Sequence, residues 1–313
     1  MSPHPLRVVV LLLVVFVVLA SGCTQLQQLF ASEPPSTPVK NTTEPEVVNA
    51  TNATNATIEV LSPRFDYRSL RTGNMTAYLL KLSGDSAIII GSNNETVLLD
   101  TGSDSDYRMM ILALRNWGVE KLDAVIVSRN TPNTNSNIGA LSTVFPIGKV
   151  YHNGLGEYTE PLSSLIEIIS LEAINVDRTV QVGTLQLRFI VPYDDSNGFS
   201  SEENQNSILT KVTYGKSSVL YAAGCDFACE GRVVDANLNA NILISAIRGS
   251  CDSTTTFFLS KVQSQAVATQ GNPCGEFNVR METFGIKNYY TEKDGVLAFT
   301  TDGQGSWVVG GEQ

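Results

Sequence analysis

The sequence predicts a layered α/β protein with mixed β-sheets. From Asn74 onward, short apolar and β-branched runs that are typical of strands alternate with segments of helical periodicity. Two of the strand-like runs, Ala87–Ile90 and Thr96–Leu99, flank a polar turn and predict an antiparallel hairpin. Many strands with interleaved helices favour mixed sheets that are covered by helices.

The elements of the first half follow from their periodicity. Asp106–Trp117 places Met, Leu and Ala residues on one side at helical spacing, and Gly118 ends the helix. Asp100 is expected to cap the turn after the hairpin by accepting backbone N–H bonds. The other expected elements are strands at Thr76–Leu82, Ala124–Val127 and Lys149–His152, and helices at Ile138–Phe145 and Leu162–Ile169.

The second half continues the alternation without a strict sequence repeat. Tyr214-Gly215-Lys216 separates two β-branched runs and predicts a hairpin turn. Strands are expected at Val180–Val182, Leu185–Val191, Ser207–Tyr214, Ser218–Ala222, Asn241–Ala246, Ala266–Thr269 and Val296–Thr300, and helices at Thr254–Val262 and Phe277–Phe284.

The composition bounds the class of protein. The chain has 313 residues, a formal net charge of −10 and a hydrophobic fraction of 42%, which is typical of a globular protein. Once the ends are set aside, about 250 residues remain, enough for one large core. The acidic balance and the lack of a basic run argue against a nucleic-acid surface.

Residues 1–23 read as a targeting signal. Val8–Ala20 is an apolar run of signal-peptide length, and Ala20-Ser21-Gly22-Cys23 resembles a lipobox in which Cys23 is lipidated. An ordinary cleaved signal and an uncleaved anchor are the alternatives. All three place the rest of the chain outside the cytoplasm. We expect it to be membrane-anchored at the outer face of the cytoplasmic membrane or the cell surface.

Residues 24–57 form a tether that precedes a domain at 58–313. Pro, Thr, Asn and Glu dominate the tether, so it has too few apolar side chains to offset the entropy of ordering. We expect a glycosylated, disordered stalk, with simple low complexity as the alternative. N-x-S/T sequons occur at Asn41, Asn49, Asn52 and Asn55, and again in the domain at Asn74 and Asn94.

Cysteine usage agrees with export. Besides Cys23, the chain has Cys225, Cys229, Cys251 and Cys274. An even number of cysteines outside the cytoplasm suggests two disulfides, for which three connectivities are possible.

An ordered set of segments resembles the metallo-β-lactamase fold. Leu80–Gly102 resembles its opening hairpin, and Val119–Val127 resembles the strand that leads into its metal loop. Asn204–Asp226 is similar to one branch, the extracellular hydrolase-like domain of competence DNA-uptake channel proteins (the ComEC group). Later motifs of that branch match Ala246–Ser250, Gly271–Phe277 and Gly285–Gly303. The resemblance implies a four-layer αβ/βα sandwich of two mixed sheets with a metal site along one edge.

The resemblance also implies metal-ligand positions, and this chain fills them with poor ligands. Asn, Ser and Thr bring no negative charge and only weak donor atoms, whereas a catalytic zinc needs several imidazoles or carboxylates. The degenerate positions are Thr134 and Pro132 (or Arg129, if the loop has an insertion), Ser136, Asn137, Ile247, Arg248 and Glu276. Asp226 keeps a carboxylate, with Cys225 inserted before it.

The few remaining candidates for catalysis are weak. The remnant carboxylates are Asp226, Glu276 and Asp100, and Asp226 with Glu276 could hold Mg²⁺ or Ca²⁺ only weakly. The chain has only two histidines, of which His152 is expected to be a hydrogen-bonded loop residue. With so few histidines, no Ser-His-Asp arrangement is found.

In the fold that the resemblance implies, Cys225, Cys251 and Cys274 border one pocket. We therefore favour the disulfides Cys251–Cys274 and Cys225–Cys229, which would hold loops that a metal holds elsewhere. The alternative is a thiolate zinc site formed by Cys225, Cys251, Cys274 and Asp226, which an oxidising compartment disfavours.

Together these features predict a surface-anchored, catalytically inactive pseudo-hydrolase that needs no cofactor. It would act as a binding or structural module, with a polar ligand or an envelope protein as its partner. One alternative is a divergent hydrolase of phosphodiesters that uses Zn or Mn. The other is an accessory protein of DNA uptake.

Overall fold

The computed structural model describes residues 47–48, 58–60, 74–154, 162–165, 167–193, 198 and 200–312. The predicted signal, Cys23 and the sequons at Asn41, Asn49, Asn52 and Asn55 lie outside these residues. Within them, no helix is long and apolar enough to cross a membrane.

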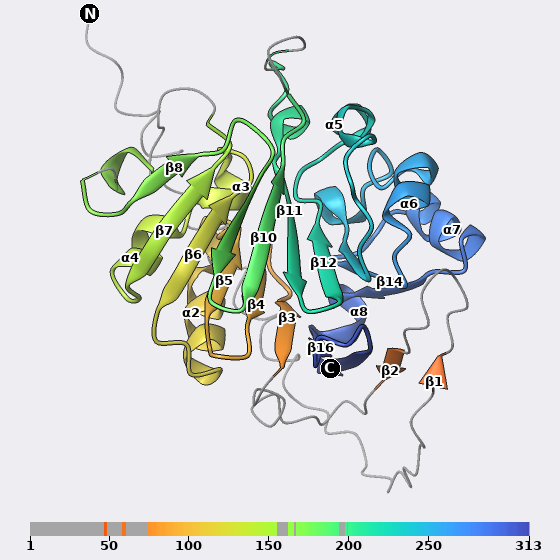
Figure 1. The fold of residues 1–313 in the computed structure, drawn as a ribbon, viewed down its shortest axis with the longest axis horizontal. Helices are drawn as coiled ribbons and strands as arrows, with labels where there is room; N and C mark the ends of the chain where they lie inside the picture. The colour runs from red at the N-terminus through yellow and green to blue at the C-terminus, as the bar shows by residue number, and fades with distance from the viewer. Residues whose placement is uncertain are drawn as a thin grey trace, which may run out of the picture. The chain divides into compact units, whose positions relative to one another are not determined.

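Two mixed β-sheets form the centre of the domain (Figure 1). The larger sheet has the strand order β1 (Val47–Val48), β2 (Ile58–Val60), β17 (Trp307–Glu312), β16 (Val296–Thr301), β3 (Met75–Leu79), β4 (Ala87–Ile90), β5 (Thr96–Leu99), β6 (Leu122–Val127), β7 (Ile147–His152) and β8 (Leu171–Ala173). The smaller sheet has the order β15 (Lys287–Tyr290), β14 (Ala266–Thr269), β13 (Ile242–Ile244), β12 (Ser217–Tyr221), β11 (Leu209–Tyr214), β10 (Leu185–Ile190) and β9 (Arg178–Val182).

Each sheet has a parallel part and an antiparallel part. Strands β5 to β8 pair in parallel, as do β12 to β15, whereas β16, β3, β4 and β5 pair antiparallel. The helices are α2 (Tyr107–Asn116), α3 (Pro132–Asn135), α4 (Ile138–Ser142), α5 (Phe227–Val233), α6 (Thr256–Val262), α7 (Gly275–Thr283) and α8 (Thr291–Asp294), with 3-10 helices at Asp104–Asp106, Ser163–Leu165, Glu203–Asn206 and Ala246–Gly249.

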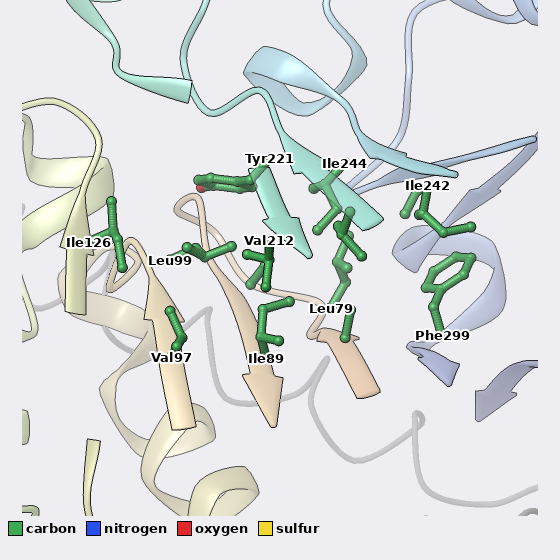
Figure 2. Close-up of a cluster of buried hydrophobic side chains, with 14 of the residues drawn as sticks. Leu79, Ile89, Val97, Leu99, Ile126, Val212, Tyr221, Ile242, Ile244 and Phe299 are labelled. Atoms are coloured by element: carbon green, nitrogen blue, oxygen red, sulfur yellow. The ribbon is translucent and has the colours of Figure 1, made fainter. Parts of the chain in front are cut away.

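Alternating side chains along the strands divide the apolar residues into three cores. In β5, Val97 and Leu99 belong to the core between the two sheets, whereas Leu98 packs with α2 and α4 on the outer face of the larger sheet. In β12, Leu220 packs instead with α5, α6 and α7 on the outer face of the smaller sheet. Figure 2 shows the inner core, to which both sheets contribute. The layers are therefore helix, sheet, sheet, helix, which confirms the predicted four-layer sandwich.

One expected element is wrong, and several short ones were not expected. Of the helix predicted at Leu162–Ile169, the described residues form only a 3-10 turn at Ser163–Leu165. Leu162, Leu165 and Ile169 keep the helical spacing and are buried, but the two serines and three isoleucines of this segment have modest helix propensity. The unexpected elements are short, so their periodicity is weak. They are α3, α5, α8, β2, β8, β15 and β17, together with β1, which lies inside the range assigned to the tether.

Candidate functional site

The candidate site lies where strands β5, β6 and β12 end. Strands β5 and β6 are parallel neighbours, so Asp100 and Ser128, which follow them, meet at one edge of the larger sheet. Tyr221 ends β12 in the smaller sheet, and its hydroxyl donates a 2.8 Å hydrogen bond to Oδ2 of Asp100. Figure 2 shows the Tyr221 ring reaching from its strand toward Leu99, the last residue of β5. This bond joins the two sheets at the site.

Asp100 is the buried centre of this edge. Its Oδ1 accepts a 2.7 Å hydrogen bond from the backbone N–H of Ser128, and its Oδ2 accepts one of 2.6 Å from the Ser128 hydroxyl. Burial raises the pKa of Asp100 to about 7, although nearby Arg129 and the bonds from Ser128 and Tyr221 oppose the shift. Burial also raises the pKa of Tyr221 well above its usual value, so its hydroxyl keeps the proton that it donates.

Arg129 brings a buried positive charge into the site. The residue is 4% exposed, and its Nη2 forms a 2.6 Å ion pair with Oδ2 of Asp85. Burial lowers the pKa of Arg129, but the carboxylates of Asp85 and Asp100 outweigh this effect and raise it overall. The guanidinium also packs on Gly224 of the smaller sheet's loop, where an added Cβ would lie 1.5 Å from Nη1. We call Asp85, Asp100, Arg129 and Tyr221 the Arg129 cluster.

A second arginine joins the same two sheets. Arg248 follows β13 of the smaller sheet, in the 3-10 turn Ala246–Gly249, and has a positive φ of 55°. Its Nη1 donates to three carbonyl oxygens of the loop before β4 in the larger sheet, those of Leu82 at 2.8 Å, Ser83 at 2.8 Å and Gly84 at 3.2 Å. The Arg248 guanidinium therefore provides the hydrogen-bond donor for three backbone carbonyls of a loop that belongs to the other sheet.

In the polar loop 128–137, the side chains at the predicted ligand positions form hydrogen bonds to the protein's own backbone. Thr134 Oγ1 donates to the carbonyl of Arg129 at 2.5 Å, and Ser136 Oγ donates to that of Pro132 at 2.7 Å. Asn137 Nδ2 donates to the carbonyls of Thr101 at 2.7 Å and Ser103 at 2.6 Å. These side chains fix the shape of the loop, which leaves them poorly suited to hold an external ligand.

The predicted remnant carboxylates do not gather around one point. Asp226 is the N-cap of α5, where its Oδ1 accepts from the backbone N–H groups of Ala228 at 3.1 Å and Cys229 at 3.0 Å. Glu276 is exposed in the first turn of α7, and Ile247 packs beside the outer core of the smaller sheet. Only Asp100 belongs to the Arg129 cluster.

Both favoured disulfides are present. Cys225 is bonded to Cys229 across the start of α5, and Cys251 is bonded to Cys274 at the N-cap of α7. The second bond joins the loop that contains Arg248 to the helix that contains Glu276. Because all four sulfur atoms are in disulfides, the alternative thiolate zinc site does not fit this arrangement.

The residues present do not fit a catalytic metal centre. In the described part of the chain, no three His, Cys, Asp or Glu side chains are grouped so that they could share one ion. The edge holds instead a guanidinium that is already paired with Asp85. A second cation beside that guanidinium would be repelled, and Thr and Asn oxygens could not compensate for the repulsion.

His152 is hydrogen-bonded, as expected, but it is a strand residue that pairs with Val127 of β6 and not a loop residue. It ends β7 and is 5% exposed, and its Nδ1 accepts a 3.1 Å hydrogen bond from the backbone N–H of Gly154. Burial lowers the pKa of His152, so the imidazole is neutral near pH 7. The stability that this neutral ring contributes is lost as pH falls through its folded-state pKa.

Asp85 and Tyr221 are site residues that sequence reasoning misses, and it finds Arg129 only as an alternative ligand position. Tyr221 reads as one more apolar residue of a strand, and Asp85 as a turn residue in Gly84-Asp85-Ser86. One signal was available. Arg129 is the only charged residue in the loop 128–137, directly after the buried strand β6, which is an unusual place for an unpaired charge.

The raised pKa of Asp100 predicts an acid-favoured contribution to stability. Its folded pKa of about 7 lies above the reference value of 3.8, so between these values the folded state holds a proton that the unfolded state has lost. The free energy of unfolding should therefore fall as pH rises through this window, by at most about 1.4 kcal/mol per pH unit. Asp100→Asn should flatten this slope in urea titrations at several pH values. Parallel profiles for variant and wild type would contradict the assignment.

Comparisons with known proteins identify the fold. No protein-family profile matches the sequence, and no curated protein sequence is similar to it. Among solved structures, the metallo-β-lactamase fold protein YhfI from Bacillus subtilis is 13% identical with a TM-score of 0.53, over 73% of this chain and 99% of that one.

Two further similarities are weaker. A diphosphatase from the PhnP family is 16% identical with a TM-score of 0.48, over 72% of this chain and 98% of that one. Tm1679, described as a metal-dependent hydrolase of the β-lactamase superfamily, is 12% identical with a TM-score of 0.48, over 69% and 95% of the two chains. The layer order and the similarity to YhfI show that this chain has the metallo-β-lactamase fold.

Proposed function

We propose that this domain is a non-hydrolytic form of the metallo-β-lactamase fold that serves as a binding or structural module at the cell envelope. The observation that carries the proposal is the Arg129 guanidinium, which is 4% exposed and lies between Asp85 and the Gly224 turn. It brings the positive charge that a metal would otherwise supply at this edge.

Two features of the cluster favour a permanent role for this side chain. The Asp85 pair is almost completely buried, with side-chain exposures of 5% and 10%, so the loss of either partner would leave a charge without compensation. Gly224 leaves no room for Arg129 to move toward the turn. The guanidinium is thus fixed by charge and by shape.

The arrangement is more typical of a rigid binding or structural module than of an enzyme that turns over a substrate. Arg129 and Arg248 each join a loop of one sheet to the other sheet, and the Cys251–Cys274 bond fastens a third loop. Hydrolysis by this fold would require an activated water molecule at the edge. The polar side chains of loop 128–137 that could position one are bonded to the backbone instead.

Export and membrane anchoring belong to the same proposal. They rest on the apolar run Val8–Ala20, the lipobox-like end at Cys23 and the Pro/Thr/Asn-rich tether. Two disulfides agree with an oxidising compartment. The ComEC-type resemblance suggests an envelope role near a transport channel, and the net charge of −10 argues for a protein partner over DNA.

Metal analysis tests the proposal directly. Full-length protein, purified in detergent without chelators from zinc- and manganese-supplemented cells, should contain only substoichiometric metal by elemental mass spectrometry. It should not hydrolyse a model phosphodiester above the rate in buffer. Stoichiometric zinc or manganese, with hydrolysis that is lost in Asp226→Asn, would overturn the proposal. Asparagine keeps the helix cap at this position but removes the carboxylate, so the loss could not be ascribed to unfolding.

A further inference from the structure

We propose that Asn74 and Asn94 carry N-linked glycans that cover one end of the larger sheet and leave the opposite end, which holds the Arg129 cluster, bare. The inference rests on the export part of the proposed function and is independent of metal chemistry. It concerns two described residues of the folded domain.

The distribution of sequons along the chain is uneven. From residue 58 to the C-terminus, Asn74-Met75-Thr76 and Asn94-Glu95-Thr96 are the only N-x-S/T sequences. The loop beside the Arg129 cluster reads Arg-Asn-Thr-Pro-Asn-Thr-Asn-Ser-Asn at 129–137 and is dense in Asn, Thr and Ser. None of its asparagines has Ser or Thr two positions later. Acceptor sites are thus absent where the composition would most readily create them.

The strand register places both sequons at the same end of the larger sheet. Thr76 of β3 pairs with Ile90 of β4, and Ile90 pairs with Thr96 of β5, so the two sequon threonines lie in one row. Each asparagine precedes its threonine by two residues and lies beyond this row, just outside the strand. Asp100 follows the other end of β5, so the Arg129 cluster lies at the opposite end of the same strands.

Both asparagines are accessible in the folded domain. Asn94 is exposed in the β4–β5 turn, where its backbone N–H donates to the carbonyl of Gly91 at 3.1 Å, and its φ is 65°. Asn74 is partly exposed directly before β3. A glycan on either residue would project from a strand end into solvent and displace no part of the core.

The burial of the two sequon threonines requires glycosylation to precede folding. Thr76 and Thr96 are each 1% exposed, and Thr76 Oγ1 shares a 3.0 Å hydrogen bond with Thr300 Oγ1. A transferase that recognises the threonine cannot reach it in the folded sheet. The glycans must therefore be added during export, before β3 and β5 join the sheet.

The reaction is a substitution at the anomeric carbon of a phosphate-activated, membrane-bound glycan donor. The asparagine Nδ2 forms a bond to that carbon while the bond from the carbon to the phosphate oxygen breaks. The phosphate leaves with the electron pair, and Nδ2 gives up one proton. The chain supplies only the acceptor amide, and the exporting cell supplies the donor and the transferase.

Glycopeptide mass spectrometry of the full-length protein, purified from the membranes of its native cell, tests the proposal. Peptides that contain Asn74 and Asn94 should each carry a glycan mass. The intact mass should fall by one glycan in Asn74→Gln and in Asn94→Gly, because glycine accepts the positive φ at position 94. Asn93→Gln, in the same turn but outside any sequon, is the matched control and should keep the full glycan mass.

An unmodified peptide at either Asn74 or Asn94 would overturn the proposal, whatever the state of the tether sequons. Unmodified protein found in the cytoplasmic fraction would overturn it together with the export on which it rests. Neither outcome bears on the metal analysis, so failure here and failure of the non-hydrolytic assignment are distinguishable.

Discussion

Replacing Arg129 by alanine is expected to lower the free energy of unfolding by about 3–5 kcal/mol. The substitution would leave the buried Asp85 carboxylate without the cation that pairs with it. Urea denaturation followed by circular dichroism measures the change. Lys149→Ala is the control, because it breaks a 2.7 Å pair with Glu172 that is partly exposed and should cost less than about 1 kcal/mol. Equal losses in the two variants would contradict a special role for Arg129.

A double-mutant cycle with Gly224 tests the contact itself. In the wild-type background, Gly224→Ala should be strongly destabilising, because the new Cβ would lie 1.5 Å from Nη1 of Arg129. In the Arg129→Ala background the same substitution should cost much less. Coupling between residues in contact is typically about 0.5–3 kcal/mol, whereas additive effects would show that the guanidinium does not pack on this turn.

Removal of the Cys251–Cys274 bond by a double alanine substitution should cost about 3 kcal/mol. The two cysteines are 23 residues apart, so the bond restricts a sizeable loop of the unfolded chain. It also fastens the loop of Arg248, so its removal should raise amide hydrogen exchange in residues 246–255. Thermal unfolding and hydrogen exchange of the full-length protein provide both measurements.

The Cys225–Cys229 bond provides the comparison. Its cysteines are only four residues apart, so loop closure accounts for about 2 kcal/mol. The double alanine variant at these positions should retain wild-type exchange at residues 246–255. A loss of protection there that equals the loss in the first variant would contradict a local role for the Cys251–Cys274 bond.

Much of the fold could be predicted because its signals are local. The alternation of Val97, Leu98 and Leu99 already predicts a strand with apolar neighbours on both faces, and the structure places those side chains in two separate cores. Elements of three or four residues, such as β8 and α3, carry too few periods to be recognised, and long-range pairing decides them.

The position of the site in the fold could be predicted from the sequence, but the contacts between its side chains could not. The strand ends near Asp100 and Ser128 follow from the order of elements, and the favoured disulfides are confirmed. The pairing of Arg129 with Asp85 joins positions 44 residues apart, and the Tyr221–Asp100 bond joins positions 121 apart. No local pattern encodes either contact. The first joins loops beside β4 and β6 of the larger sheet, and the second depends on how the two sheets face one another.

The positive charge at this edge of the sheets belongs to a side chain, Arg129, and not to a dissociable ion. This affects how the stability of the domain depends on its surroundings. A bound ion stabilises a fold by mass action, so its effect disappears when the ion is scarce or chelated. A guanidinium on the chain is present at every dilution and cannot be stripped by a competitor. If the domain is exported as we propose, it would in this way keep the same stability in metal-poor and metal-rich media.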